Sequence, residues 1–367
     1  MKLLLVLVAM LLVACGYVLH PAILFPGVPL SIVAQSFLVK TLFKFDPVKV
    51  RDLADQYIKS TPSSLLETTT FNITYDTRSS ELYLKESFNP TGMAQYSLRV
   101  YQPKLYREGG YPVIMFIHGG GWLVGNLDMY DLFCNAISER GFVVVSVGYR
   151  RTPENPFPAC LNDNLNALSW IGKHLRDERF NANLNQLTIS GDSAGGHLSI
   201  HTQVRTFLVD QKVLERESIP NISYQALLYP VVEFYSYGDV KYSSYASFSE
   251  NGILIDGHTM DMFWKYLTIN STREEISNNP YVSVLSAVDS SDKKFYSQFK
   301  PGFIWTAEYD VLRDEGEAFT RAVNEANGPK LLHTRWPQCF HGFASVFSQQ
   351  KHTTDYVEPI LNFFKSQ

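Results

Sequence analysis

The sequence predicts an α/β protein built around a mostly parallel β-sheet with helices on both faces. Three short runs of apolar and β-branched residues support this, because such runs are typical of strands buried on both faces of a sheet. They are Val113–Ile117, Leu187–Ser190 and Phe303–Ala307, and Leu331–Trp336 is expected as the last strand. Two of the runs lead directly into glycine-rich motifs. The carboxyl ends of parallel strands share one edge of a sheet, so we expect both motifs to lie there.

The second of these motifs, Gly191–Gly195, predicts a nucleophilic serine on a sharp turn. Ser193 stands in its middle, after a predicted strand and before a helix expected over Ala194–Val209. The flanking glycines remove side chains where the turn is tight and where the helix packs closely against its strand. The context of a nucleophile elbow is therefore present as well as its letter pattern.

The first motif, His118–Trp122, places three glycines directly after the strand Val113–Ile117. A glycine run in this position exposes backbone N–H groups that can stabilise the negative charge formed when a serine attacks a carbonyl. Together, the two motifs indicate acyl-transfer chemistry.

A serine nucleophile needs a base and an orienting acid, and in this architecture the order along the chain is Ser, Asp or Glu, then His. Asp310 follows the predicted strand Phe303–Ala307, and His341 lies in the loop after the last strand. We predict these two as the acid and the base. Asp314 is expected in the first turn of the next helix, where the helix dipole favours it, and His333 is expected as a packed or surface residue of the last strand.

Four blocks of the chain resemble the hormone-sensitive-lipase-like branch of the α/β-hydrolases, and the N-terminal layout is similar to arylacetamide deacetylase and neutral cholesterol ester hydrolase. The blocks are His118–Trp122, Gly191–Gly196, Asp310–Gly316 and His341–Phe343, with Tyr149–Glu154 as a further similar stretch. The resemblance implies carboxylic ester hydrolysis by Ser193, His341 and Asp310. It also implies oxyanion-hole donors, which are Gly119, Gly120, Gly121 and Ala194.

The chain departs from this pattern at three positions. Leu123 and Ala307 stand where the relatives carry cysteines, so their disulfide is not expected here. Gly148 replaces the usual Asp or Asn before Tyr-Arg, which removes a side chain that would hydrogen-bond locally. None of these changes affects the predicted triad.

The domain organisation follows from the positions of the motifs. We expect a signal-anchor helix, a membrane-proximal segment that forms part of a cap, two parts of the hydrolase core, and a cap insertion between these parts. The ranges are 1–20, 21–95, 96–230 with 296–367, and 231–295. A net charge of −4 gives no indication of nucleic-acid binding. We expect no cofactor and no metal.

The cap insertion is rich in aromatic residues, and 14% of the whole chain is Phe, Trp or Tyr. We predict that Phe263 and Trp264 of this insertion, with Trp122 of the glycine motif, line a pocket for a small lipophilic ester. The competing interpretation is that these side chains are ordinary core of the cap.

The N-terminus predicts a membrane anchor, because no Asp, Glu, Lys or Arg occurs from Leu3 to Val39. The competing interpretation is a signal peptide cleaved near Val13–Gly16, which would give a secreted form. Three glycosylation motifs begin at Asn72, Asn221 and Asn270, and Asn72 and Asn270 are expected in loops. With the anchor they predict a single-pass type II protein of the endoplasmic reticulum membrane, its catalytic domain in the lumen.

Two other functions are compatible with the motifs. The first is a catalytically inactive hydrolase fold that acts as a binding protein, which requires the loss of a triad residue. The second is amide deacetylation by the same triad. The sequence does not decide between acylglycerols, sterol esters and aryl esters as substrates, nor does it indicate an oligomeric state.

Overall fold

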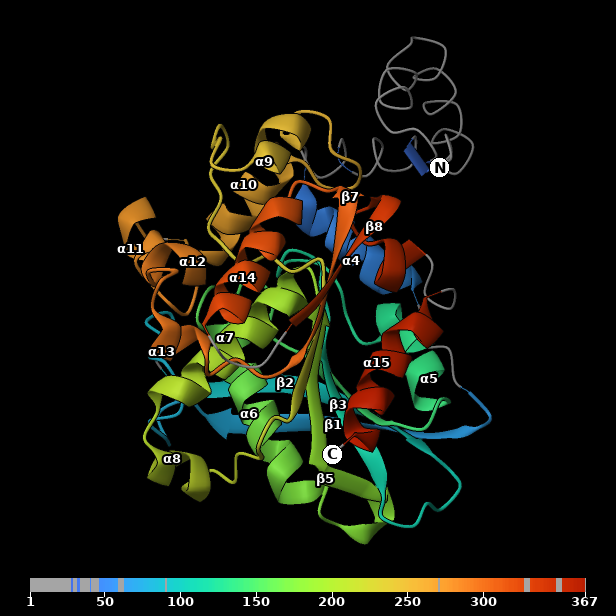
Figure 1. Ribbon diagram of the computed structural model, residues 1–367. Coiled ribbons are helices and arrows are strands. Elements are labelled where there is room, and N and C mark those ends of the chain that lie inside the picture. The colour runs from blue at the N-terminus through green and yellow to red at the C-terminus, as the bar shows by residue number, and fades with distance from the viewer. Residues whose placement is uncertain are drawn as a thin grey trace.

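The computed structural model describes most of the chain, and Figure 1 shows its fold. The described residues are 28, 32–33, 40, 46–58, 63–89, 91–269, 271–326, 331–347 and 352–366. The predicted anchor at residues 1–20 and the glycosylation candidate Asn270 lie outside them. Within the described ranges, no helix combines the length and apolar character needed to cross a bilayer.

The centre of the fold is one eight-stranded sheet in the order β1-β2-β4-β3-β5-β6-β7-β8. The strands are β1 (Leu66–Asp76), β2 (Met93–Pro103), β3 (Tyr111–Ile117), β4 (Val143–Gly148), β5 (Ala182–Asp192), β6 (Tyr224–Leu228), β7 (Gly302–Tyr309) and β8 (Leu331–Phe340). β2 is antiparallel to both β1 and β4, and every other neighbouring pair is parallel. The predicted fold, a mostly parallel sheet of the α/β-hydrolase type, is confirmed, as are the four predicted strands.

Helices cover both faces of this sheet (Figure 1). They are α4 (Pro47–Tyr57), α5 (Asp131–Ser138), α6 (Ala159–His174), α7 (Ala194–Leu208), α8 (Gln211–Arg216), α9 (Ser243–Phe248), α10 (Gly257–Leu267), α11 (Arg273–Ser277), α12 (Val284–Ala287), α13 (Lys293–Tyr296), α14 (Arg313–Glu325) and α15 (Thr353–Lys365). α6, α7 and α14 lie on one face, and α5 and α15 lie on the other. The central strands of the sheet are thereby removed from water on both sides.

β3 shows why the central strands are continuous apolar runs. Met115 and Ile117 belong to the core that contains residues of α6 and α7. Ile114 and Phe116 belong to the core on the opposite face, where the Phe116 ring lies 5.3 Å from that of Phe133 on α5. Since successive side chains of a strand point to opposite faces, a strand covered on both sides has apolar residues at every position.

One predicted boundary and the predicted loop position of Asn72 need correction. β1 pairs with β2 along its whole length, so the sheet begins before the predicted core boundary at residue 96. Asn72 lies within β1 and not in a loop, although its side chain is exposed. The predicted insertion at 231–295 falls between β6 and β7, and it contains the helices α9 to α12 and all but the last residue of α13.

The parallel strands place all the predicted functional residues along one edge of the sheet. His118 follows β3, Ser193 follows β5, Asp310 follows β7 and His341 follows β8. All four strands point in the same direction, so their carboxyl ends and the residues after them meet although they are far apart in the sequence.

Candidate active site

Ser193 occupies the turn between β5 and α7 in a backbone conformation that side chains rarely adopt. Its φ is 53° and its ψ is −120°. Its N–H donates to the carbonyl oxygen of Leu228 on β6 at 2.9 Å. A strained backbone of this kind persists only where the surrounding structure holds it. Here the turn directs the serine hydroxyl away from the sheet.

The glycines around Ser193 allow this turn to be compact. A Cβ atom at Gly195 would lie 1.9 Å from the carbonyl oxygen of Ile117, and one at Gly191 would lie 2.4 Å from the backbone of Gly195. Backbone atoms cannot yield as a flexible side chain can. The predicted close approach of helix and strand at these two glycines is confirmed.

The structure brings the three predicted triad residues together. His341 Nε2 lies 2.8 Å from Ser193 Oγ, and His341 Nδ1 lies 2.8 Å from Asp310 Oδ2. The other oxygen of Asp310 accepts the N–H of Leu312 at 2.9 Å, which fixes the carboxylate. All three side chains are buried. In this arrangement His341 can take a proton from Ser193 while Asp310 holds its ring in one tautomer.

The neighbouring candidates have other roles. His333 Nε2 lies 2.9 Å from the hydroxyl oxygen of Thr306 on the adjacent strand, and His333 is exposed, so it is a surface residue of β8, as one of the two predicted roles had it. Asp314 is in the first turn of α14, also as predicted. It accepts hydrogen bonds from the hydroxyl of Ser243 and from the N–H of Ser244. Neither residue competes with His341 or Asp310.

The glycine loop after β3, residues 118–122, curves past Ser193. Gly120 and Gly121 have φ values of 108° and 59°. The N–H of Gly119 donates to Asp192 Oδ1 at 2.7 Å, so it is not free to bind an oxyanion. In the described part of the chain, no protein acceptor meets the N–H of Gly120 or Gly121. Of the four predicted donors, Gly120, Gly121 and Ala194 therefore remain.

A cavity of about 300 Å³ opens beside Ser193 and His341, and its walls are mainly apolar. The wall residues include Val50 and Ala54 of α4, Leu254 and Ile255 of the segment before α10, and Phe263 of α10. Such a lining with few polar groups fits a lipophilic substrate. The site therefore combines a polar reaction centre with an apolar binding cavity.

Of the three residues predicted to line this pocket, only Phe263 does so. Trp122 and Trp264 are at most 1% exposed, and their rings pack against each other with centroids 4.7 Å apart. Both belong to the hydrophobic core and not to the cavity wall, which agrees with the competing interpretation that these aromatic residues are ordinary core. Phe263 lies directly over the glycine loop, because a Cβ at Gly121 would be 2.4 Å from its ring.

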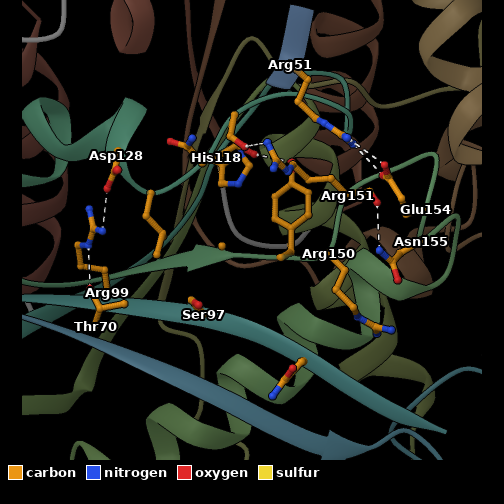
Figure 2. Close-up of a pocket in the computed structure, with 16 residues that line it drawn as sticks. Arg51, Thr70, Ser97, Arg99, His118, Asp128, Arg150, Arg151, Glu154 and Asn155 are labelled. Atoms are coloured by element: carbon orange, nitrogen blue, oxygen red, sulfur yellow. Dashed lines mark hydrogen bonds and ion pairs between the residues drawn. The ribbon is translucent and has the colours of Figure 1, made fainter. Parts of the chain in front are cut away.

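A second pocket, of about 530 Å³, lies on the other side of the glycine loop and is strongly polar (Figure 2). Four arginines line it, and each is paired with carboxylates. Arg51 of α4 binds both oxygens of Glu154, and Arg151 binds both oxygens of Asp55 on α4. The pairs made by Arg51 and Asp55 attach α4 to the core. Since each of the four arginines is paired with a carboxylate, the pocket has no unpaired arginine.

His118 is a buried, neutral part of this wall. Its Nδ1 lies 2.8 Å from the carbonyl oxygen of Gly119, so Nδ1 carries the proton, and its ring stacks on that of Tyr149. Burial lowers the pKa of His118 to about 4. Its Nε2 has no hydrogen-bond partner among the described residues.

Several site residues were missed by the sequence analysis. Val50 and Ala54 were not named, although they belong to a helix within the segment 21–95 that was expected to form part of the cap. Asp192 precedes Ser193 and is 1% exposed. Its signal was a charged residue at the end of a buried strand, where an uncompensated charge is costly.

We expect the buried His118 to make stability depend on pH. The unfolded chain binds the imidazole proton near pH 6.5, whereas the folded chain binds it only near pH 4. Between these values the unfolded state holds more protons, so the free energy of unfolding falls as pH falls. In urea unfolding at pH 7, 6 and 5, His118→Asn should weaken this decline by up to about 1.4 kcal/mol per pH unit. Equal slopes in the variant and the wild type would contradict the assignment.

Comparisons with known proteins agree with this geometry. A family model described as the alpha/beta hydrolase fold matches residues 114–345, more than half of the chain. Carboxylesterase NlhH of Mycobacterium tuberculosis is 30% identical over 257 residues, covering 69% of this chain and 73% of that protein. Carboxylic ester hydrolase LipN of the same organism is 32% identical over 259 residues, covering 70% of this chain and 63% of that protein.

Among solved structures, a thermostable esterase from Pseudomonas putida shares the fold with a TM-score of 0.67 and 21% identity, covering 92% of this chain and 95% of the other. The predicted enzyme class, a serine hydrolase of the carboxylesterase and lipase type, is confirmed by these relatives. On its sequence and its architecture, the chain belongs to the α/β-hydrolase family.

Proposed function

We propose that this protein hydrolyses lipophilic carboxylic esters through an acyl-enzyme formed on Ser193. The observation that carries the proposal is the continuous hydrogen-bond chain from Ser193 Oγ through His341 to Asp310, with 2.8 Å at each step. Ser193 and His341, the first two residues of this hydrogen-bond chain, lie in the wall of an apolar cavity that Gly120 and Gly121 also line. A binding protein would have no need for such an arrangement, so the inactive alternative is not favoured.

In the proposed mechanism, His341 Nε2 takes the proton of Ser193 as Oγ attacks the ester carbonyl carbon. The N–H groups of Gly120, Gly121 and Ala194 bind the oxygen that becomes negative. Asp310 stabilises the imidazolium ion. When the C–O bond to the alcohol breaks, His341 gives its proton to the departing oxygen. Water then enters and loses a proton to His341 as its oxygen attacks the acyl carbon. His341 returns this proton to Ser193 Oγ when the bond between Oγ and the acyl group breaks, which releases the acid and restores the enzyme.

The cavity supports the substrate class. Its walls come from α4 and from the segment that ends in α10, and we propose that these two parts act together as a cap over the site. Acylglycerols, sterol esters and aryl esters all present an apolar group that such a cavity would accept. The similarity to arylacetamide deacetylase adds aryl amides as candidates, since the same triad can attack an amide carbonyl.

The first prediction from the proposed function concerns the nucleophile. Ser193→Ala should lower turnover of short p-nitrophenyl esters on the order of a millionfold, because the attacking oxygen is lost. Ser199→Ala is the matched control, since Ser199 lies on the helix α7 that follows Ser193, is buried, and its hydroxyl donates to the carbonyl oxygen of Gly195. We expect the control to remain active and both variants to keep the wild-type circular dichroism spectrum.

A fluorophosphonate probe completes this test, because it labels only an activated serine. Labelling of the wild type and of Ser199→Ala, but not of Ser193→Ala, is expected. An active Ser193→Ala variant, or a wild type that is not labelled, would reject the proposed function. Rates on matched aryl esters and aryl amides then separate esterase from amidase activity.

The second prediction concerns chain-length preference. Phe263→Ala should enlarge the cavity beside Ser193 and shift the preferred p-nitrophenyl ester toward longer acyl chains or bulkier alcohols. Trp264→Phe is the comparison variant, since Trp264 lies in the core behind the cavity. We expect it to lower the melting temperature without changing the order of preferred esters. An unchanged preference in Phe263→Ala would remove Phe263 from the specificity pocket.

The third prediction concerns the N-terminus. We propose that residues 1–20 anchor the enzyme in the endoplasmic reticulum membrane with its catalytic part in the lumen. The uncharged stretch from Leu3 to Val39 supports this, and so does the exposure of Asn72 and Asn221. In human cells, the protein should resist carbonate extraction and shift in mobility after endoglycosidase H. Release into the medium with a new N-terminus near Cys15 would contradict the anchor.

A further inference from the structure

We propose that Asp192 is a positioning residue that holds the glycine loop, residues 118–122, in register with the nucleophile. This inference rests on the proposed function and extends it to a residue outside the triad. Asp192 precedes Ser193 directly, so its backbone moves with the elbow. Its side chain reaches across to the loop that supplies the oxyanion donors.

The contacts of Asp192 join three segments of the site. Its Oδ1 accepts the N–H of Gly119 at 2.7 Å. Its Oδ2 accepts the hydroxyl of Ser345 at 2.6 Å and that of Tyr130 at 3.0 Å. Ser345 lies four residues beyond His341. The Asp192 carboxylate, beside the nucleophile, therefore bonds both the glycine loop and the segment that follows His341.

The steric fit at Gly119 shows how closely the two parts meet. A Cβ atom at Gly119 would lie 2.8 Å from the carbonyl oxygen and 2.8 Å from Oδ2 of Asp192. Any larger residue at this position would push the loop away from the elbow. The glycine is thus required by the approach of Asp192, and its N–H is used by the same side chain.

The charge of Asp192 has no cationic partner in the described chain, since no lysine or arginine pairs with it. Burial raises the pKa of Asp192, and the hydrogen bonds from Ser345, Gly119 and Tyr130 oppose that rise. A buried carboxylate stabilised only by donors loses much of its stabilisation if one donor moves. Movement of the Gly119 N–H away from Asp192 is therefore costly, so the glycine loop keeps its position while charge develops on the substrate oxygen.

The consequence for catalysis follows from the sequence of the loop. Gly120 and Gly121 are the next two residues after Gly119, so fixing the N–H of Gly119 fixes the origin of both donors. Binding of an oxyanion is sensitive to donor position, and a misplacement of about 1 Å costs on the order of a hundredfold in rate. Loss of the Asp192 contact should lower kcat more than it raises KM.

The test compares three variants with the wild type on one p-nitrophenyl ester. Asp192→Ala removes both carboxylate oxygens. Asp192→Asn keeps an oxygen for Gly119 and presents an amide to Ser345 and Tyr130, whose hydroxyls can accept. Ser345→Ala removes a different hydrogen bond from the same carboxylate. Rates are expressed per serine labelled by the fluorophosphonate at completion, so that unfolded protein does not count.

We expect kcat of Asp192→Ala to fall about a hundredfold, with KM within about threefold of the wild type. Asp192→Asn should recover most of this loss, and Ser345→Ala should lose less than Asp192→Ala. A kcat of Asp192→Ala close to the wild type, a loss confined to KM, or equal losses in Asp192→Ala and Asp192→Asn would each overturn the positioning role. Failure of the wild type to be labelled would reject the proposed function itself and this role with it.

Discussion

The compressed turn at Ser193 is the constraint on which the rest of the site depends. The backbone of Ser193 has a positive φ, and it can hold that conformation because β5 and α7 meet with no side chain between them. The carbonyl oxygen of Ile117 lies where a Cβ of Gly195 would be, so the end of β3 is pressed against the start of α7. The glycine loop begins at the next residue after Ile117. The compression that exposes the nucleophile therefore also brings the oxyanion donors beside it.

Hydrogen bonds then align the parts that this packing brings close. Asp310 is held by the N–H of Leu312, and His341 lies between Asp310 and Ser193. Asp192 connects the glycine loop with Ser345. Each of these polar groups is buried, and a buried polar group without a partner is costly. The alternatives to the observed arrangement are consequently unfavourable, and the site is preorganised before a substrate enters.

The sequence predicted those parts of the protein that depend on local pattern. The strands that carry the site have a continuous apolar pattern, and the elbow glycines stand at fixed distances from Ser193, so both could be recognised. Asp310 and His341 followed from chain order and from their positions after strands. The role of Asp192 could not be predicted, because it depends on contacts with residues 119, 130 and 345 that only the folded sheet brings together.

The same reason explains the errors at the cavity. Trp122 ends the glycine motif and Phe263 lies in the insertion, and composition alone does not reveal which of these two large aromatic residues faces the cavity. Trp122 follows a residue with a φ of 59° and turns back into the core, while Phe263 reaches the cavity from α10. Asn72 was expected in a loop because its neighbours are polar. An edge strand with one solvated face, such as β1, has the same composition.

The cavity and the polar pocket share α4 as a common wall, and the two sides of this helix are held by different forces. Val50 and Ala54 line the cavity, whereas Arg51 lines the polar pocket (Figure 2) and Asp55 pairs with Arg151 of that pocket's wall. Neither Val50 nor Ala54 is fully buried. Val48 and Val50 pack only partly buried against the core, so the attachment of α4 also depends on the pairs of Arg51 with Glu154 and of Asp55 with Arg151. Such pairs, when partly exposed, contribute at most about 1 kcal/mol each, far less than the packing that holds α7. The geometry of the nucleophile and the position of α4 thus depend on separate interactions, so α4 can shift at the cavity wall without disturbing Ser193.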